Sequence, residues 1–392
     1  MHRAVVVDAV RTPTGKRNGR LQGYHPVDLA AIPLRALVER NQLDPALVDD
    51  VIMGCVTQTG EQSFNVGRNA ALAAGFPEDV VGTTVDRQCG SAQQASHFAA
   101  QGVMAGAYDV AIAAGVESMS RVPMGITAHQ GPGRPFGPRM EERYANSLVP
   151  QGISAELIAE KWGLSREHLD RIAYRSHMRA ARATDEGRFA REIVPVETRA
   201  NGATETVTTD EGIRPDTSPE ILAGLPPVFK ADGVVTAGNS SQISDGAAAV
   251  LIMSEDKAVA LGLEPKVYFR QFAMAGVDPV SMLTGPIPAT ARALERAGLS
   301  IDDIDLFEVN EAFASVVGIW LAENGGSDPD ALWERTNVNG GAISTGHPLG
   351  GTGAKLTATL VHEMERRQAR YGLQTMCEGG GMANAMILER AA

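Results

Sequence analysis

Apolar runs and stretches of helical spacing alternate along the first part of the chain. Four apolar, largely β-branched runs are typical of buried strands: residues 4–10, 51–56, 80–85 and 109–115. Apolar residues recur at helical spacing over three stretches: residues 28–40, 65–74 and 92–105. Asp28 is a candidate N-terminal cap for the first helix. Strands that alternate with helices predict an α/β fold with largely parallel strands.

The pattern changes between residues 117 and 241. Glycine and proline interrupt it repeatedly, and amphipathic spacing predicts helices only at 153–162 and 166–184. Loops of this length inside a compact protein are usually functional. We therefore expect residues 118–242 to form a loop-rich insertion that covers the core.

The second half of the chain echoes the first. Residues 299–305, which precede a predicted strand at 306–309, resemble residues 43–50 at an offset of 299 − 43 = 256. The glycine-rich turn around His347 echoes the turn around Cys89 at an offset of 347 − 89 = 258. Similar offsets indicate an internal duplication, whose pseudo-two-fold axis would bring the two turns together.

Composition narrows the class of protein. The chain has 392 residues, 44% of them hydrophobic and 21% charged, with a formal net charge of −12. This length allows two or three domains at roughly 100–200 residues each. No run of Lys and Arg is dense enough to follow phosphates, so nucleic acid is not an expected partner. An anionic substrate would need a local basic patch.

The sequence gives no indication of a signal peptide, a membrane helix or a disulfide framework. The first strand follows Met1-His2-Arg3 directly, and no apolar run approaches the roughly 20 residues that a membrane helix needs. Three scattered cysteines without a CxxC pair argue against a disulfide framework and against a metal site. We expect a soluble, cytoplasmic protein without a metal and without membrane contact.

Cys89 stands where a strand-like run passes into a helical pattern. Unpaired backbone N–H groups and the positive end of a helix dipole meet there, and both favour a thiolate, which is the nucleophilic form. The alternative is that Cys89 is a small buried hydrophobe, as many free cysteines are. Cys55, inside an apolar run, is expected to be structural.

Three stretches of the second half carry further candidate chemistry. Asn310 follows a predicted strand end, where α/β sheets bind ligands, although it could instead cap a helix. His347 lies among six glycines within residues 339–353, where little packing is available for a structural histidine. Cys377 precedes three glycines that begin at Gly379 and offer N–H groups for an oxyanion; it could instead be a buried structural cysteine.

Together these groups suit acyl transfer from a thioester. His347 can take the proton of Cys89, Cys89 can carry the acyl group, and Cys377 can move a proton to or from carbon.

Five motifs occur in one order along the chain: VDRQCGSAQQA, GNSSQISDGAAAV, NEAFA, GGAISTGHPLGGTGAK and CEGGG. In this order and at these separations they resemble those of a thiolase (acetyl-CoA C-acyltransferase), and the resemblance covers essentially the whole chain. The segments GEQS, SSQISDGAAAVL and RYGLQTMCEGGG are most similar to actinobacterial thiolases of lipid and steroid breakdown.

The resemblance implies a role for each candidate. Cys89 matches the acylated nucleophile, and His347 matches the base that also lines an oxyanion hole. Asn310 matches the residue that holds a water in that hole, and Cys377 matches the acid and base at the α-carbon. The backbone N–H groups of Cys89 and Gly379 match a second oxyanion hole.

The resemblance also implies the substrate site and the architecture. Arg214 and Ser241 match positions that touch coenzyme A, which is a substrate and not a resident cofactor, and Met282 matches a position near the acyl pocket. The implied fold has two βαβαβαββ halves in a five-layered α-β-α-β-α core, assembled as a homodimer or homotetramer. The implied segments are 1–117 with 243–268, the loop domain 118–242, and 269–392.

The expected activity is the coenzyme A-dependent cleavage of a 3-ketoacyl-CoA, as in fatty acid β-oxidation, through an acylated Cys89. A short-chain acetyltransferase acting on acetoacetyl-CoA is the alternative; a ketosynthase-like enzyme or a non-catalytic CoA-binding relative fits less well. Gln88, Ala92 and Ala383 depart from the usual thiolase motifs next to the expected oxyanion holes, and none of these departures removes a catalytic group.

Overall fold

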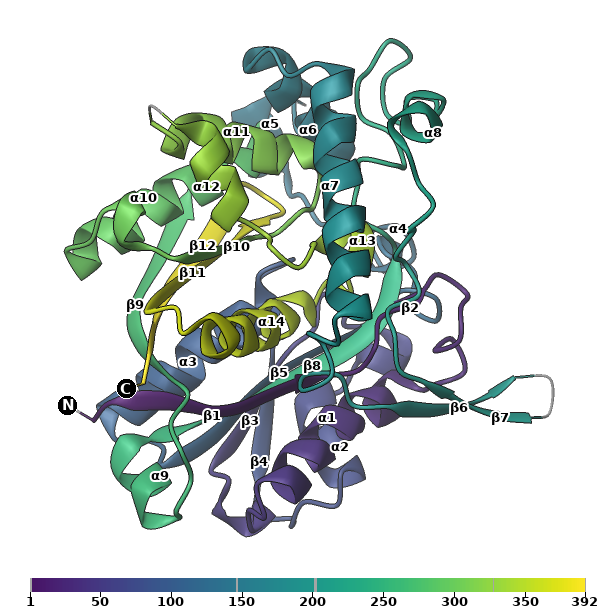
Figure 1. Cartoon of the computed structure of the whole chain (residues 1–392). Coiled ribbons are helices and arrows are strands. Elements are labelled where there is room, and N and C mark those ends of the chain that lie inside the picture. The colour runs from purple at the N-terminus through teal and green to yellow at the C-terminus, as the bar shows by residue number, and fades with distance from the viewer. Residues whose placement is uncertain (1, 146, 201–202, 327, 392) are drawn as a thin grey trace.

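A computed structural model describes residues 2–145, 147–200, 203–326 and 328–391, and a long twisted sheet runs through it (Figure 1). Nine strands follow the order β10-β11-β12-β9-β1-β8-β5-β3-β4, and β2 pairs with β8. The strands are β1 Ala4–Arg11, β2 Gly15–Lys16, β3 Asp50–Gly54, β4 Val81–Val85, β5 Val110–Ser118, β8 Ser244–Ser254, β9 Val267–Gly276, β10 Leu306–Val309, β11 Tyr371–Glu378 and β12 Met382–Arg390.

The sheet consists of two parts with the same strand order. In the first part, β3 runs parallel to β4 and β5, while β8 is antiparallel to both β5 and β1. In the second part, β10 runs parallel to β11, and β12 is antiparallel to both β11 and β9. A parallel bridge from Phe307 to Thr336 stands where the first part has β4. The predicted duplication is confirmed by this shared order.

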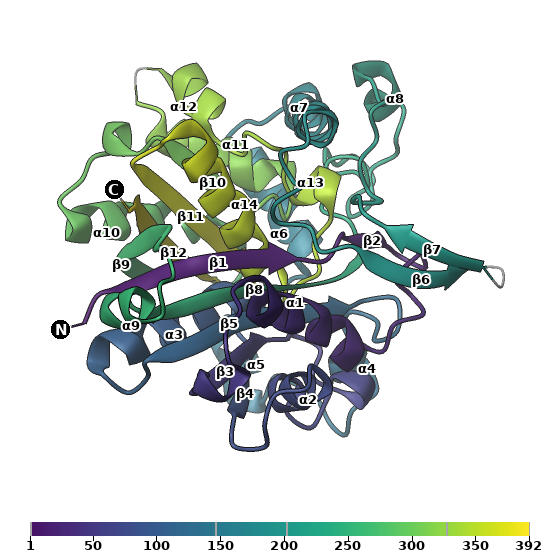
Figure 2. The ribbon, with the colours of Figure 1, turned by 60° about the horizontal axis from the view of Figure 1, so that its bottom comes forward.

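Helices complete five layers (Figures 1 and 2). Helices α3 (Ser91–Ala105) and α14 (Thr352–Arg367) share one hydrophobic cluster with strands of both sheet parts and form the middle layer. Helices α1 (Pro26–Arg40) and α2 (Val66–Ala73) cover the outer face of the first part. The outer face of the second part is covered by α10 (Pro286–Ala297), α11 (Ala314–Asn324) and α12 (Pro329–Arg335).

Small residues let the two middle helices approach closely. A Cβ atom on Gly353 of α14 would lie 2.1 Å from the backbone nitrogen of Gln93 in α3. No side chain fits there, so this glycine is required by contact between the helices. Because each middle helix follows one of the two candidate turns, this contact also fixes the turns relative to each other.

The insertion contains more regular structure than the sequence predicts. Its elements are α4 Ile126–His129, α5 Pro138–Tyr144, α6 Gln151–Lys161, α7 Arg166–Asp185, β6 Val196–Ala200, β7 Ala203–Val207 and α8 Pro219–Ala223. The two predicted helices correspond to α6 and α7, and α7 stands upright along the side of the core (Figure 1). The β6–β7 hairpin, which projects from the body (Figure 2), was not predicted.

Two local predictions are wrong. The cap of α1 is His25, whose Nδ1 accepts a hydrogen bond from the Val27 nitrogen at 3.3 Å, because Pro26 begins the helix and leaves Asp28 in its first turn. Cys55 lies one residue beyond β3, although it is fully buried as expected. Residues 1 and 392, the outer limits of the implied segments, lie outside the described residues.

The remaining helical elements are short. They are α9 Glu255–Ala260, α13 Ala342–Thr345, and 3₁₀ turns at Pro45–Leu47, Gly60–Gln62, Met282–Thr284 and Ile301–Asp303. Within the described part of the chain, no helix has the length and hydropathy needed to cross a membrane.

Candidate active site

Cys89 lies in a tight turn between β4 and α3. The hydroxyl of Ser91 accepts from the Arg87 nitrogen at 2.9 Å and donates to the Gln88 carbonyl at 2.6 Å. Gln88 has a φ of +48°, a left-handed conformation that closes the turn. Gly90 then caps α3, so the thiol is presented at the start of the helix and is 5% exposed.

The thiol of Cys89 is protonated in this environment. Burial raises its pKa to about 12, and the carboxyl of Glu378 adds to the shift, while a hydrogen bond with Gln151 at the start of α6 lowers it. Burial therefore opposes the thiolate that the sequence analysis expects at this helix end. Because burial disfavours the thiolate, the nucleophile needs a base.

His347 supplies a base in a defined tautomer. Its Nδ1 lies 2.6 Å from the hydroxyl of Thr352, and that hydroxyl donates its proton to the Pro348 carbonyl at 2.8 Å. The Thr352 oxygen must therefore accept from Nδ1–H, which makes Nε2 the nitrogen that carries the lone pair. Burial lowers the pKa of His347 to about 3, with a further contribution from Lys355, so the imidazole is neutral.

Asn310 faces this base directly. It follows β10, its backbone nitrogen donates to the Thr375 carbonyl, and its Nδ2 lies 3.4 Å from His347 Nε2. The alternative of a helix cap is wrong, because α11 begins at Ala314 with Phe313 as its N-cap. Asn310 Oδ1 is buried and has no hydrogen-bond partner among the described residues.

Cys377 lies next to the last residue of β11 in an apolar cluster. The cluster also contains Met282, Leu283 and Phe313, and Cys377 is fully buried. Burial, followed by the proximity of Cys89, raises the pKa of the Cys377 thiol well above its usual value. The two thiols therefore influence each other electrostatically although they come from different halves.

The turn after Cys377 rests on the nucleophile turn. A Cβ atom on Gly379 would lie 3.1 Å from Gln88 Oε1, and Ala383 stands directly opposite Cys377 on β12. Ala92 is fully buried in the first turn of α3. All three departures from the expected motifs thus lie in the immediate surroundings of the thiols.

The predicted coenzyme A contacts are only partly brought together. Ser241 donates its backbone N–H at 3.0 Å to the carbonyl of Ala312, a residue that lies two positions after Asn310. Arg214 lies on the insertion, where it is exposed and its backbone nitrogen donates to Nδ1 of His177 in α7 at 3.2 Å. Met282 lies in the same apolar cluster as Cys377.

Glu378 is a site residue that the sequence analysis did not single out. Its carboxyl is fully buried, and neither oxygen has a hydrogen-bond partner among the described residues. A Cβ atom on Gly90 would lie 2.1 Å from Oε1, so the carboxyl rests against the nucleophile turn. Burial raises the pKa of Glu378 to about 8, partly opposed by Arg87. Its position as the one charged residue in the glycine-rich motif CEGGG is the sequence signal that could have identified it.

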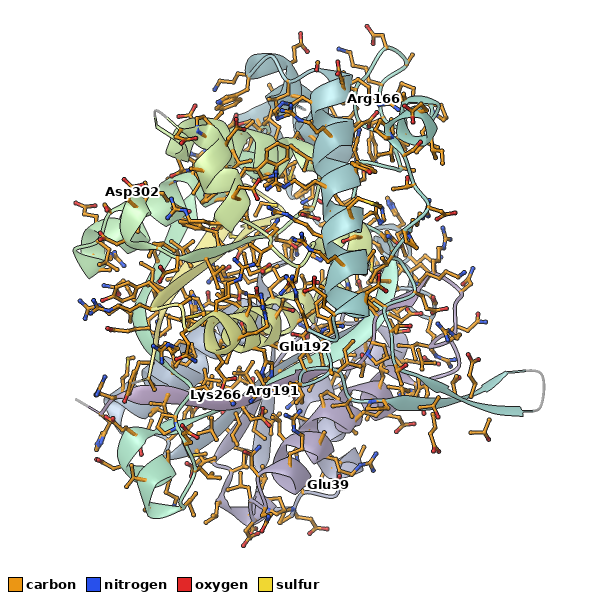
Figure 3. The ribbon with its side chains drawn as sticks, in the orientation of Figure 1. Glu39, Arg166, Arg191, Glu192, Lys266 and Asp302 are labelled. Atoms are coloured by element: carbon orange, nitrogen blue, oxygen red, sulfur yellow. The ribbon has the colours of Figure 1, made fainter. Side chains whose placement is uncertain are left out.

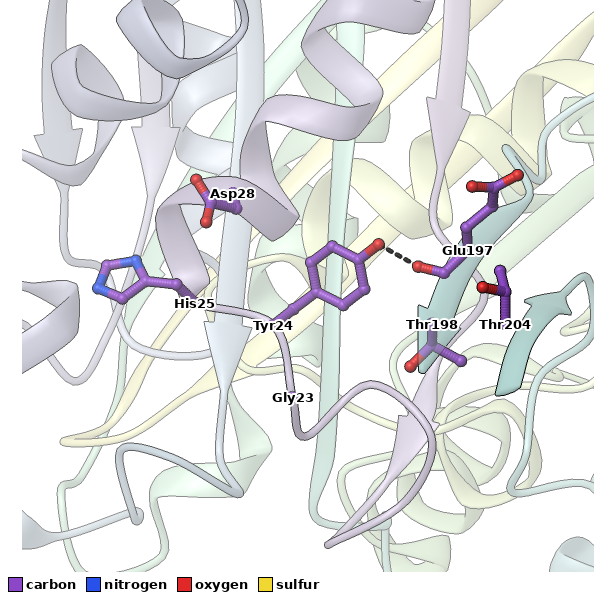
Figure 4. Close-up of a pocket in the computed structure, with 7 residues that line it drawn as sticks. All are labelled: Gly23, Tyr24, His25, Asp28, Glu197, Thr198 and Thr204. Carbon is purple, nitrogen blue, oxygen red and sulfur yellow. Dashed lines mark hydrogen bonds between the residues drawn. The ribbon is translucent and has the colours of Figure 1, made fainter. Parts of the chain in front are cut away.

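A surface pocket away from these residues lacks comparable chemistry. It has a volume of about 470 Å³ and lies where the start of α1 meets the β6–β7 hairpin (Figure 4). The hydroxyl of Tyr24 donates to the Glu197 carbonyl across it. None of the predicted site residues lines this pocket. Among the described residues, no group of His, Cys, Asp and Glu side chains is arranged to hold a metal ion.

Comparisons with known proteins match nearly the whole chain. The sequence profile of the thiolase N-terminal domain matches residues 4–256, and that of the thiolase C-terminal domain matches residues 263–390. The chain is 51% identical to the steroid 3-ketoacyl-CoA thiolase FadA6 of Mycobacterium tuberculosis, over 100% of this chain and 95% of that protein. It is 47% identical to the 3-ketoacyl-CoA thiolase of Bacillus subtilis, over 99% and 100% of the two chains.

A solved structure shows the same fold. The acetyl-CoA acetyltransferase of Bacillus anthracis superposes with a TM-score of 0.91 at 38% identity, over 100% of this chain and 99% of that one.

Proposed function

Because the chain belongs to the thiolase family, we propose that it cleaves a 3-ketoacyl-CoA with free coenzyme A to give acetyl-CoA and a shortened acyl-CoA. The observations that carry the proposal are two buried thiols that influence each other electrostatically and a neutral histidine whose Nε2 lone pair faces Asn310. A nucleophile and a separate acid for carbon are what such a cleavage requires.

The first step forms the acyl-enzyme. The proton of Cys89 passes to Nε2 of His347, and the sulfur attacks the 3-keto carbon. The resulting oxyanion lies by the imidazolium N–H and a water held by Asn310, whose nitrogen lies 3.4 Å from Nε2. One such donor contributes about 3–4 kcal/mol to the stability of the transition state.

The second step breaks the C2–C3 bond. The electron pair of that bond leaves as the enolate of acetyl-CoA, with the N–H groups of Cys89 and Gly379 at its thioester oxygen. Cys377 donates its proton to the enolate carbon, and the raised pKa of this thiol keeps that proton in place until then. The acyl chain remains on Cys89 as a thioester.

The third step restores the enzyme. Cys377 thiolate, a strong base because of its burial, takes the proton of free coenzyme A. The coenzyme A sulfur attacks the thioester on Cys89 and releases the shortened acyl-CoA. The Cys89 sulfur recovers its proton from His347, so all groups return to their starting states.

The acyl group of the substrate is proposed to be longer than acetyl. Support comes from the relatives, which are named a steroid 3-ketoacyl-CoA thiolase and 3-ketoacyl-CoA thiolases at 47–51% identity. Arg214 and Ser241 would contact coenzyme A, and Met282 would border the acyl pocket. The exposed Arg214 offers a local cation on a chain with a net charge of −12.

Assembly and location complete the proposal. We propose that the protein is cytoplasmic and forms a homodimer or homotetramer. Each subunit would consist of a first half at 1–117 and 243–268, a loop domain at 118–242 and a second half at 269–392. The edge strand β4 supports self-association, because Val81 on it is 55% exposed and the nearby Phe64 is 91% exposed.

The test is the initial thiolysis rate on acetoacetyl-CoA, on a long-chain 3-ketoacyl-CoA and on a steroid-derived 3-ketoacyl-CoA, each with free coenzyme A. Equal or faster turnover of either bulky substrate is the expected result. Turnover confined to acetoacetyl-CoA would identify a short-chain acetyltransferase. Absence of cleavage for all three would contradict the proposal.

A further inference from the structure

Lys355 is a charged residue inside the core, where an unpaired charge is costly. It lies in the first turn of α14 and is 4% exposed. Its Nζ donates three hydrogen bonds: to the Thr345 carbonyl at 2.7 Å, to Thr345 Oγ1 at 2.9 Å and to the Gly346 carbonyl at 2.8 Å. All three protons of the ammonium are therefore used by the two residues that precede His347.

Buried charges from other parts of the chain balance Lys355. Arg11 of β1 donates two hydrogen bonds to Asp210, at 2.7 and 3.0 Å, and one to Glu192 at 2.6 Å. These three side chains are at most 1% exposed. Glu192 lies beside α14 (Figure 3), where the hydroxyl of Thr359 donates to it at 3.0 Å. Two cations thus share two carboxylates, so Lys355 can keep its charge despite burial.

Some ionisable groups around Lys355 raise the pKa of its ammonium and others lower it. Burial lowers its pKa to about 7, Asp210 raises it, Arg11 lowers it, and Glu192 and Glu308 raise it. Burial raises the pKa of Glu308 itself well above its usual value. With a pKa of about 7, Lys355 is a cation in acidic solution and begins to lose its charge near neutral pH.

The same ammonium acts on the base. After burial, the positive charge of Lys355 is the next cause of the lowered pKa of His347. The other groups at the imidazole are neutral: Asn310 faces Nε2 and Thr352 faces Nδ1. A base must be neutral to accept a proton, so a nearby cation that disfavours the imidazolium keeps it ready.

We propose that Lys355 is the positioning residue of the catalytic base: its three hydrogen bonds hold Thr345 and Gly346, the two residues that precede His347. The proposal rests on the proposed function, in which His347 takes the proton of Cys89. Among the described residues, the ammonium of Lys355 donates to Thr345 and Gly346 and to neither thiol, so its effect is exerted through His347.

The test compares Lys355→Met with Lys355→Arg. The readout is the rate at which iodoacetamide alkylates Cys89 from pH 3 to pH 9, followed by mass spectrometry, together with kcat and KM for thiolysis. In Lys355→Met, the lost cation raises the pKa of His347, so the imidazole stays protonated to a higher pH and the acid limb of the alkylation profile moves upward. Lys355→Arg keeps the positive charge, so the acid limb of its alkylation profile should lie at the same pH as in the wild type.

Positioning predicts a further split in the kinetics. A displaced base should reduce kcat of Lys355→Met by about 10- to 100-fold while KM for coenzyme A stays within about twofold. Lys266→Met is the matched control, because Lys266 pairs with Glu365 at 2.8 Å outside the site (Figure 3 labels it). Its limb and kcat should equal those of the wild type.

The proposal would be overturned if the acid limb of the Lys355→Met alkylation profile lay at the same pH as in the wild type. It would also be overturned if the kcat of this variant were unchanged. If that variant does not fold, Thr345→Val removes one acceptor of Nζ and keeps the charge. It should lower kcat without moving the limb, and a wild-type kcat or a moved limb would count against the proposal. A wild-type protein that neither cleaves 3-ketoacyl-CoA nor forms an acyl-Cys89 would instead refute the proposed function itself.

Discussion

The two halves place a turn at corresponding points, and the turns differ in how their polar groups are satisfied. In the second half, the backbone nitrogen of His347 donates to Ser244 Oγ at 3.1 Å, the ring bonds Thr352, and Lys355 occupies the preceding carbonyls. Every one of these bonds restricts the base to a single orientation.

The turn in the first half is satisfied differently. It is closed by its own residues, but both oxygens of Glu378 and the Nε of Arg87 beside it are buried without partners among the described residues. The duplication therefore repeated the fold without repeating the hydrogen bonds. The base is held fixed and neutral, whereas the nucleophile Cys89 has a neighbour whose charge changes near pH 8.

The largest effect should come from removing the base of the fixed turn. In His347→Gln no group accepts the proton of Cys89, so kcat/KM for thiolysis should fall by about 10²- to 10⁴-fold. Steady-state thiolysis assays measure this loss. His129→Gln changes an exposed histidine and is the control. If kcat/KM of His347→Gln lay within a few-fold of the wild-type value, His347 would not be the base and the contrast between the two turns would fail.

The next effect tests the contact that holds the two turns together. A methyl group in Gly353→Ala would lie 2.1 Å from the Gln93 nitrogen, so α3 and α14 must separate. Overpacking of this kind destabilises by about 1–3 kcal/mol, which urea unfolding measures. Gly23→Ala, where nothing lies within 4 Å, should leave stability unchanged. Equal stability of the two variants would contradict the close contact.

A smaller effect should follow from removing the hydroxyl of Thr352, which fixes the tautomer of His347. Thr352→Val cannot accept from Nδ1–H of His347, so the buried donor loses its partner and the ring is free to change tautomer. We expect kcat to fall about tenfold, by analogy with other groups that orient a catalytic histidine through its second nitrogen. Thr352→Ser retains the hydroxyl and should restore the rate. Similar rates for valine and serine would show that the tautomer is set elsewhere.

The smallest effect concerns the unsatisfied turn. Glu378 is a neutral acid below its pKa of about 8 and a carboxylate above it, and the carboxylate raises the pKa of Cys89. Glu378→Gln removes that charge, so iodoacetamide should alkylate Cys89 a few-fold faster than in the wild type above pH 8. Below pH 7 the two rates should coincide. A constant ratio across the pH range would mean that the carboxyl does not ionise there.

Hydrophobic spacing was sufficient to predict most of the core. The alternation of apolar runs and helical stretches reflects burial directly, so β1, β3, β5, α1, α3 and α7 lie close to their predicted ranges. The β6–β7 hairpin was missed although Asn201-Gly202, a pair that favours hairpin loops, stands between its strands in the sequence. Its strands are rich in Thr and Glu, so no apolar run marks them.

The side chains that meet at the site were only partly predictable. Cys89, Asn310, His347 and Cys377 could be identified because each is an unusual residue type beside glycines or a strand end. Glu378, Thr352 and Lys355 act through partners that only folding brings near, such as Gly90 for Glu378. Spacing along the chain does not reveal such contacts.

The most direct test of the account is acylation of Cys377→Ala. In this variant His347 and Cys89 are intact, so acetyl-CoA should acetylate Cys89 at close to the wild-type rate, as intact mass and peptide mapping would show. Cleavage of the C2–C3 bond of a 3-ketoacyl-CoA should be lost, because no thiol protonates the enolate. Equal loss of acylation and cleavage, or an acyl group found on a residue other than Cys89, would contradict the division of roles between the two thiols.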